Sequence, residues 1–214
     1  IREAIEKGDF SGWDDPRLPT VSALRRRGYT PEAIRDFWIE LGLTQKDISI
    51  SMQTIDSKNS KIIDSSSARR SFVEEPINLN LMYPEDSSDI DGMVRLNNHP
   101  DHPEMGYREW GLEQKNIQIS KNDYTEGVVR LKDYADVEIR GDNAIFISRE
   151  KSGDAQIIHW NSSDSCVKAE IIVPGDNENI LLGGVIEDSE YSVGEIVQLE
   201  RMGFAKVEFV EPGN

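Results

Sequence analysis

The hydrophobic pattern of this chain changes its period near residue 70, and that change constrains the fold more than any other feature. Before it, apolar residues recur with helical spacing: Ile34, Phe37, Trp38 and Leu41 stand at i, i+3, i+4 and i+7. After it, short β-type runs are separated by clusters of Gly, Asn and Asp, without a helical pattern between them. The sequence therefore predicts an α+β chain in which helices come first and strands follow.

The expected helices begin at threonine caps and end at glycines. A threonine hydroxyl accepts a hydrogen bond from an orphan amide of the first turn, and glycine adopts the left-handed conformation that ends a helix. Pro31 favours a helix start directly after its cap, and Asp47 completes a capping-box pattern in a third helix that ends between residues 58 and 67. The caps are Thr20, Thr30 and Thr44, and the stops are Gly28 and Gly42. Arg2–Lys7 reads as part of a further helix.

The second part of the chain predicts strands at short, regular intervals. Many short strands with turn signals and no intervening helix are typical of an antiparallel sandwich or barrel. The expected strands are Ile77–Met82, Ile117–Ser120, Gly127–Leu131, Val137–Arg140, Ala144–Ser148, Ala155–Trp160, Lys168–Val173, Ile180–Ile186, Glu195–Leu199 and Ala205–Val210.

Charge is distributed unevenly along the chain. The net charge of the 214 residues is −16, but residues 1–70 hold 12 Lys and Arg against 11 Asp and Glu, so the acidity belongs to residues 71–214. Phosphate binding needs cationic side chains, so any RNA site in the second part must be local. No apolar run is long enough to span a membrane. The single cysteine, Cys166, and the absence of a secretory signal lead us to expect a cytoplasmic protein.

Motifs that carry catalysis are missing from the sequence. It contains no glycine-rich phosphate-binding loop and no nucleophile elbow, so we expect no catalytic residues in this chain. His99 and His102 have metal-like spacing, but the prolines around them indicate an extended loop, and zinc would need one or two further ligands. We therefore expect no metal site. Trp160 can stack on a base, although a core position is more common for such a residue.

Two arginine clusters are candidates for phosphate binding. The guanidinium fork of arginine matches phosphate oxygens, which favours a phosphate site at Arg25, Arg26 and Arg27. Equally, cations at a helix end interact favourably with the helix dipole without binding anything. Arg69 and Arg70, at the transition from helix to strand, are a surface pair on the simplest interpretation.

Four stretches, in order, resemble the C-terminal half of class I tRNA synthetases of the glutaminyl and archaeal or eukaryotic glutamyl type. They are Gly12–Thr20, Leu24–Thr30, Asn98–Pro100 with Pro103–Gly106, and Val137–Ala144 followed by Ile158–Trp160. The resemblance implies a helical region contacting the tRNA stem, residues 1–68, and an anticodon-binding region, residues 69–214, with two β-barrels like those of a ribosomal protein. It also implies a longer protein that attaches glutamate to tRNA using ATP and Mg²⁺. The motifs for that reaction would precede Ile1, so we expect the isolated chain to be inactive and to hold no cofactor.

The resemblance also implies which residues contact RNA. Arg25, Arg26 and Arg27 would contact the tRNA backbone. Arg69, with Arg70 as the neighbouring alternative, would contact the anticodon together with Arg130 and Arg140. Glu138 and Val129 stand where glutaminyl enzymes place basic residues, which favours the glutamyl type.

The expected partners follow from the same resemblance. They are tRNA(Glu), with tRNA(Gln) left open, and a tRNA-dependent amidotransferase. Two alternatives remain at this point: the same portion of a glutaminyl-tRNA synthetase, and an acidic β-rich protein-interaction module with no role in RNA binding.

Overall fold

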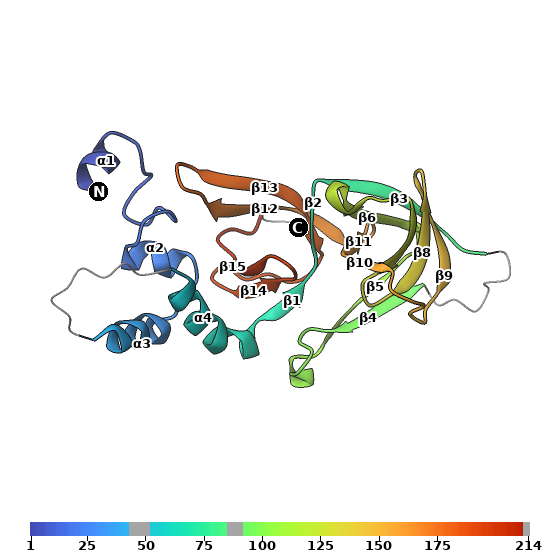
Figure 1. The fold of residues 1–214 in the computed structure, drawn as a ribbon, viewed down its shortest axis with the longest axis horizontal. Coiled ribbons are helices and arrows are strands. Elements are labelled where there is room, and N and C mark those ends of the chain that lie inside the picture. Colours follow the sequence, from blue (N-terminus) through green and yellow to red (C-terminus); the bar gives the residue numbers. More distant parts are fainter. Residues whose placement is uncertain (43–51, 85–91, 212–214) are drawn as a thin grey trace. The chain divides into compact units, whose positions relative to one another are not determined.

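The computed structural model describes residues 1–42, 52–84 and 92–211 (Figure 1). It divides into two compact units. The first comprises Ile1–Ala68, Ile172–Leu181 and Tyr191–Gly213, and the second comprises Arg69–Ile171 and Leu182–Glu190. All α-helices of the described residues end by Ile63 and the strands follow. The predicted segregated α+β class is therefore confirmed.

Four α-helices form the start of the first unit, and their ends follow the sequence signals. Thr20 and Thr30 each accept a hydrogen bond from the amide three residues on. Gly28 has φ +90°, and Tyr29 N donates to Leu24 O at 3.0 Å, which closes the helix with a Schellman motif. The predicted Thr44–Asp47 capping box lies outside the described residues. The helices are α1 (Arg2–Glu6), α2 (Val21–Arg26), α3 (Pro31–Leu41) and α4 (Met52–Ile63).

A small apolar cluster connects α2, α3 and α4. It consists of Leu24, Tyr29, Phe37 and Ile55, all buried. Phe37 is 6% exposed whereas the next residue, Trp38, is 60% exposed, although the two rings are in edge contact at 5.6 Å. The prediction that Phe37 lies on the buried face of α3 is therefore confirmed. Trp38, which the same pattern placed on that face, is exposed instead. The same unit contains the antiparallel pair β14 (Ile196–Leu199) and β15 (Gly203–Lys206).

The second unit is built on a seven-stranded sheet. Its strand order is β10-β7-β8-β9-β3-β6-β11. Two of its strand pairs, β10 with β7 and β3 with β9, are parallel, so the expectation of a wholly antiparallel sheet was wrong. Alternation along a strand reports which face is buried and says nothing about the direction of a neighbour distant in sequence. The strands are β3 (Pro76–Met82), β6 (Asn116–Ser120), β7 (Gly127–Leu131), β8 (Ala135–Arg140), β9 (Asn143–Ser148), β10 (Gln156–Ile158) and β11 (Trp160–Ser162).

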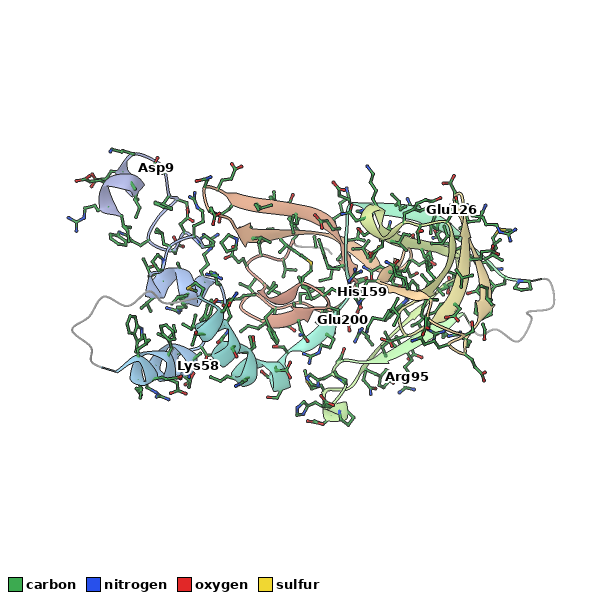
Figure 2. All side chains as sticks on the ribbon, viewed as in Figure 1. Asp9, Lys58, Arg95, Glu126, His159 and Glu200 are labelled. Carbon is green, nitrogen blue, oxygen red and sulfur yellow. The ribbon has the colours of Figure 1, made fainter. Side chains whose placement is uncertain are left out.

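The two ends of this sheet are consecutive in the chain. β10 and β11 are separated by His159 alone, so the sheet curves until its edges lie one residue apart (Figure 2). No ladder of hydrogen bonds joins β10 to β11 among the described residues, and a closed barrel is therefore not observed. The prediction of one run over Ala155–Trp160 is corrected to two strands interrupted at His159.

The sheet surrounds an apolar core. In β6, Ile117 and Ile119 are fully buried between half-exposed neighbours, as alternation predicts. Trp160 is 4% exposed, packs against Tyr134 at a ring distance of 5.1 Å, and donates from Nε1 to Lys132 O at 3.0 Å. Its interpretation as a core residue is confirmed.

Four short strands were not predicted. Each predicted strand region contains a strand, but the predicted Ala205–Val210 is a strand only through Lys206. The unpredicted strands are β1 (Ala68–Arg70), β2 (Phe72–Glu74), β4 (Met93–Asn97) and β5 (Tyr107–Gly111). The long hairpin of β12 (Cys166–Pro174) and β13 (Asn179–Glu187) pairs with β2 through β13. A Cβ at Gly184 would collide with the carbonyl oxygen of Val73, so this close approach requires glycine. No helix in the described part of the chain is long and apolar enough to cross a membrane.

Candidate nucleic-acid interface

The turn Gly12–Thr20 is built around the carboxylate of Asp15. This side chain is 1% exposed and accepts hydrogen bonds from Ser11 N at 3.0 Å and Ser11 Oγ at 3.2 Å. Arg17 donates to it from its amide at 3.1 Å, from Nε at 2.9 Å and from Nη2 at 2.7 Å. The side-chain bond from Arg17 contributes most to holding the pKa of Asp15 far below its usual value, against the opposing effect of burial. The motif is therefore a structural ion pair.

Arg17 extends this arrangement to other parts of the first unit. Its Nη2 donates to Asp9 O at 2.7 Å, and its Nη1 donates to the carbonyl oxygen of Asn177 at the tip of the β12–β13 hairpin. Asn179 Nδ2, from the same tip, lies 3.4 Å from Asp15 Oδ1. The turn that precedes α2 is thus joined to the hairpin by polar contacts.

The three arginines at the end of α2 have different surroundings. Arg25 is exposed, whereas Arg26 and Arg27 are half-buried. Arg26 forms a bidentate pair with Glu208, at 2.6 and 3.0 Å, and this pair lowers the pKa of Glu208. Arg27 lies over the ring of Tyr29 at 5.2 Å. Arg25 is thus the most accessible cation of the cluster.

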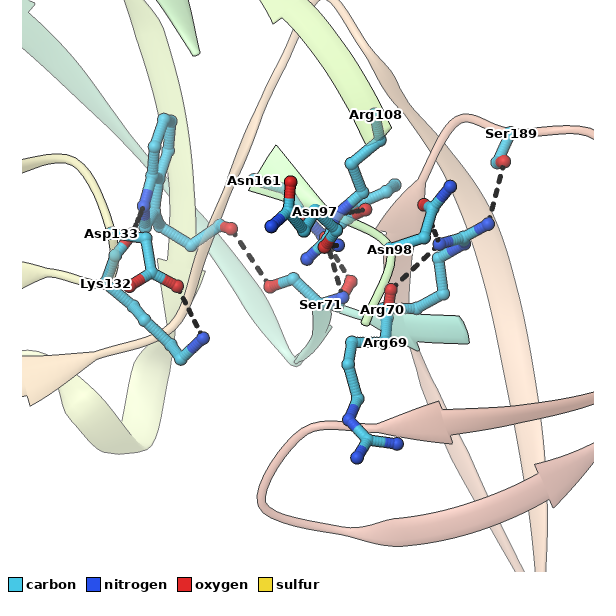
Figure 3. Close-up of polar contacts among 12 residues, drawn as sticks. Arg69, Arg70, Ser71, Asn97, Asn98, Arg108, Lys132, Asp133, Asn161 and Ser189 are labelled. Atoms are coloured by element: carbon cyan, nitrogen blue, oxygen red, sulfur yellow. Dashed lines mark hydrogen bonds and ion pairs between the residues drawn. The ribbon is translucent and has the colours of Figure 1, made fainter. Parts of the chain in front are cut away.

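Arg69 and Arg70 differ sharply although they are adjacent in β1. Arg70 is 6% exposed and Arg69 is half-buried. Their side chains leave the backbone on opposite sides, as neighbours in a strand do (Figure 3). Arg70 Nη1 donates to Asn98 Oδ1 at 2.9 Å, and its Nη2 donates to Ser189 Oγ at 3.3 Å. Because Arg69 is the more exposed of the two, it is the better candidate for an RNA contact.

Arg130 is also engaged within the second unit. Its Nη1 contacts Asp136 Oδ1 at 2.9 Å, with side-chain exposures of 14% and 0%, and its Nη2 donates to Arg149 O at 3.0 Å. Asp136 additionally accepts from Ser152 N and Ser152 Oγ, both at 2.7 Å. Burial raises the pKa of Asp136, but the hydrogen bonds from Ser152 and Arg130 outweigh it and leave the pKa lowered. Arg130 thus holds the segment after β9 in place.

Arg140 lies on the surface at the end of β8. Its side chain is 66% exposed, and its Nη2 contacts both carboxylate oxygens of Glu138 at 2.8 Å. An exposed pair of this kind contributes little to stability, so the guanidinium can exchange Glu138 for another anion at small cost.

The histidine loop is an ordered turn. His102 Nδ1 lies 2.7 Å from Glu104 Oε1, and Asp101 N donates to Nδ1 of the buried His99 at 3.0 Å. Across residues 1–42, 52–84 and 92–211, no group of three His, Cys, Asp or Glu side chains is placed to hold a metal ion. The expectation that this loop binds no zinc stays a prediction.

Two family descriptions match the chain in succession. Residues 67–156 match the anticodon-binding domain of class I tRNA synthetases for glutamate and glutamine (E and Q), and residues 2–65 match the catalytic domain of the same class. The glutamate–tRNA ligase of Pyrococcus furiosus is 40% identical over 98% of this chain. This chain belongs to the class I E and Q tRNA synthetases.

Further archaeal relatives carry the same name. The glutamate–tRNA ligases of Thermococcus kodakarensis and Methanothermobacter thermautotrophicus are 39% and 36% identical, each over 99% of this chain. The chain spans 38% of the length of each of these three relatives. The comparisons give no support to a glutaminyl enzyme or to an acidic interaction module.

The two family matches divide the predicted contact residues of the chain between two domains. Arg25, Arg26 and Arg27 fall within the segment that the family assigns to its catalytic domain, and Arg69, Arg70, Arg130 and Arg140 fall within the anticodon-binding domain. The role of each in tRNA binding stays a prediction, as does stem contact by residues 1–68.

Sequence reasoning missed the acidic partners of Arg17 and Arg108. Asp15 had a local signal, because an aspartate whose carboxylate accepts the amide two residues on is a common turn. Glu187, which pairs with Arg108 at 2.7 Å, had none, because 79 positions separate the two residues. Long-range pairs of this kind are not encoded in any periodicity.

Proposed function

We propose that this chain is the tRNA-binding portion of a glutamyl-tRNA synthetase, and that its second unit binds the anticodon of tRNA(Glu). The observation that carries the proposal is the match of residues 67–156 to the family's anticodon-binding domain. The archaeal relatives named as glutamate–tRNA ligases support glutamate as the amino acid. Most of the unit is acidic, so binding rests on a few arginines that face phosphates and splayed bases.

We extend the proposal to the shape of the RNA-binding sheet. The family's anticodon-binding region is a β-barrel, and the seven-stranded sheet has its two edge strands separated only by His159. This spacing fits a barrel whose two edge strands are joined through His159 by the chain itself rather than by a ladder of hydrogen bonds. Single-stranded RNA would lie along the second unit, which also contains Arg69.

The contacts are of two kinds. Arg25 neutralises a backbone phosphate, since it is the exposed member of its cluster. Arg69 contacts an anticodon base. Arg140 also contacts the anticodon. To do so it separates from Glu138, and an exposed ion pair of this kind costs little to break. Arg130 stays with Asp136 and supports the loop beside it, because separating this buried pair would be costly.

The longer protein to which such a portion belongs attaches glutamate to tRNA. ATP and Mg²⁺ would be held by the part of the catalytic domain that lies outside this chain. Charging of tRNA(Gln), an amidotransferase partner and a cytoplasmic location stay predictions of the family resemblance, and none of them is needed for the RNA-binding proposal.

The test is binding of tRNA(Glu) with its native and with a substituted anticodon, measured across a salt series. Arg25→Ala weakens binding of both RNAs equally and lowers the salt slope by about one unit. Arg69→Ala costs about 1–3 kcal/mol for the native RNA and reduces discrimination, by analogy with base contacts in DNA. Arg35→Ala is the matched control, because it removes the same charge from an exposed helical site. Equal affinity of all proteins for both RNAs would favour the acidic-module alternative.

A further inference from the structure

Hydrogen bonds hold the backbone on both sides of the Arg69 side chain, one with the distant Asn98 and one from the neighbouring Arg70 side chain. Arg69 N donates to Asn98 O at 2.7 Å, and Arg69 O accepts from Arg70 Nη1 at 2.9 Å. The same Nη1 reaches Asn98 Oδ1 at 2.9 Å. Arg70 thus ties the peptide of its neighbour to the loop after β4, while its Nη2 reaches Ser189 beyond the end of β13.

The next residue, Ser71, is held in the same way. Its amide donates to Glu187 Oε1 at 2.8 Å, its carbonyl accepts from Asn161 Nδ2 at 3.1 Å, and its hydroxyl donates to Trp160 O at 3.0 Å. These bonds come from β13 and β11, which flank the link between β1 and β2 (Figure 3). The segment therefore has little freedom to rotate or to shift in register.

An ion pair fixes the acid that holds Ser71. Glu187 Oε2 lies 2.7 Å from Arg108 Nε, with side-chain exposures of 5% and 10%. A buried carboxylate with a charged partner and a backbone donor keeps one geometry, because any other arrangement leaves a charge without compensation. Arg108 lies on β5, so the β4–β5 hairpin supports the segment both through Asn98 and through Arg108.

We propose that Arg70 is a positioning residue for RNA recognition. It binds no nucleotide and instead fixes the peptide from which the Arg69 side chain projects toward an anticodon base. The proposal rests on the proposed function, in which Arg69 makes the base contact. A base contact requires a donor placed within about half an ångström, so supporting hydrogen bonds determine how well it discriminates.

The chemistry of Arg70 explains why an arginine serves this role. A planar guanidinium presents its donors in a fixed fork, and here the fork meets a carbonyl, an amide oxygen and a hydroxyl from three separate segments. A lysine carries the same charge but is a single flexible ammonium that lacks this fixed arrangement of donors. Arg70→Lys therefore keeps the positive charge and removes the fixed arrangement of hydrogen-bond donors.

The experiment is a double-mutant cycle on tRNA(Glu) binding by this chain, with native and substituted anticodons. Wild type, Arg69→Ala, Arg70→Lys and the double variant are compared. We expect Arg70→Lys to lower the preference for the native anticodon by about tenfold, within the coupling range of contacting residues. In the Arg69→Ala background the same substitution should change that preference less than about twofold, and the salt slope should be unchanged by Arg70→Lys.

Two outcomes overturn the inference. A salt slope reduced by about one unit would mark Arg70 as a phosphate contact. A loss that persists in full when Arg69 is already alanine would show that Arg70 acts independently. Ser189→Ala, which removes one acceptor of Arg70 without altering any charge, keeps the test valid if Arg70→Lys does not fold. Ser189→Ala should also lower the preference for the native anticodon, by a smaller factor than Arg70→Lys. An unaltered preference in Ser189→Ala would count against the inference.

The proposed function and this inference fail differently. If the wild-type chain does not distinguish the two anticodons, the proposed function fails. If wild type distinguishes them and Arg69→Ala abolishes the difference while Arg70→Lys does not change it, only the positioning role of Arg70 is wrong.

Discussion

The two units of this chain differ in the size of their apolar clusters. Among the described residues, the cluster of the second unit has sixteen buried members, whereas the cluster that joins α2, α3 and α4 in the first has four. Truncating an apolar side chain should therefore cost more in the second unit than in the first. Ion pairs with a buried carboxylate stabilise both units, as Asp15–Arg17 does in the first and Arg130–Asp136 does in the second.

The largest expected effect tests the apolar core of the second unit. Trp160→Ala removes a buried indole and its hydrogen bond to Lys132, and should cost about 5 kcal/mol, the upper end of the range for such truncations. Urea unfolding followed by circular dichroism measures it. Ile157→Ala, in the neighbouring strand with 47% exposure, is the control and should stay within about 0.5 kcal/mol. Equal costs for both would mean that the core is misplaced.

A smaller effect is expected for the thinner core of the first unit. Phe37→Ala should cost about 3 kcal/mol, the lower end of the same range, because only a few side chains close around the ring. Trp38→Ala should stay within about 0.5 kcal/mol, since Trp38 is 60% exposed. The two variants compare adjacent aromatic residues of one helix. A larger loss of stability for Trp38→Ala than for Phe37→Ala would contradict the assigned inner face.

The polar turn of the first unit predicts a pH-dependent effect. Asp15→Asn should cost about 2 kcal/mol at neutral pH, in the range for hydrogen bonds to charged groups. The pKa of Asp15 is depressed in the folded protein, so its stabilisation is present above the usual aspartate pKa and is lost as the pH falls through the folded value. Thermal unfolding from pH 7 down to about pH 2 should therefore show the two proteins converging in acid.

The exposed neighbour Asp14 provides the control for this experiment. Asp14→Asn should leave stability nearly unchanged at every pH, because an exposed carboxylate contributes little. A difference between wild type and Asp15→Asn that is constant with pH would show that the ion pair does not hold the turn.

The smallest effect concerns a single cap. Thr20→Ala removes the acceptor for Ala23 N and should cost about 1 kcal/mol. Thr20→Ser keeps the hydroxyl and should restore most of that stability. Chemical denaturation of the three proteins measures the series, and a serine variant as unstable as the alanine variant would show that the methyl group matters rather than the cap.

Local signals predicted much of this fold. Thr20, Thr30 and Gly28 determine helix ends through bonds within a few residues, so the sequence reveals them. Alternation located the strands of the large sheet, because one face of each is buried. The strands β1 and β2 were missed since three residues are too few to show a period.

The candidate site was less predictable than the fold. The sequence and its family resemblance named the arginines, but not that Arg70 is buried or that Arg130 pairs with Asp136. These facts depend on partners such as Ser189, which is 119 positions from Arg70. Only the folded chain brings such groups together, and for that reason the choice between Arg69 and Arg70 needed the structure.

Footprinting of tRNA(Glu) on this chain measures most directly which part of the RNA is bound. Wild type should protect the anticodon loop from cleavage. Arg25→Ala should retain that protection at concentrations high enough to compensate for weaker backbone binding, and Arg69→Ala should lose it at equal occupancy. Bound tRNA whose anticodon loop stays as accessible as in free tRNA, or protection unaltered by Arg69→Ala, would contradict anticodon recognition through Arg69.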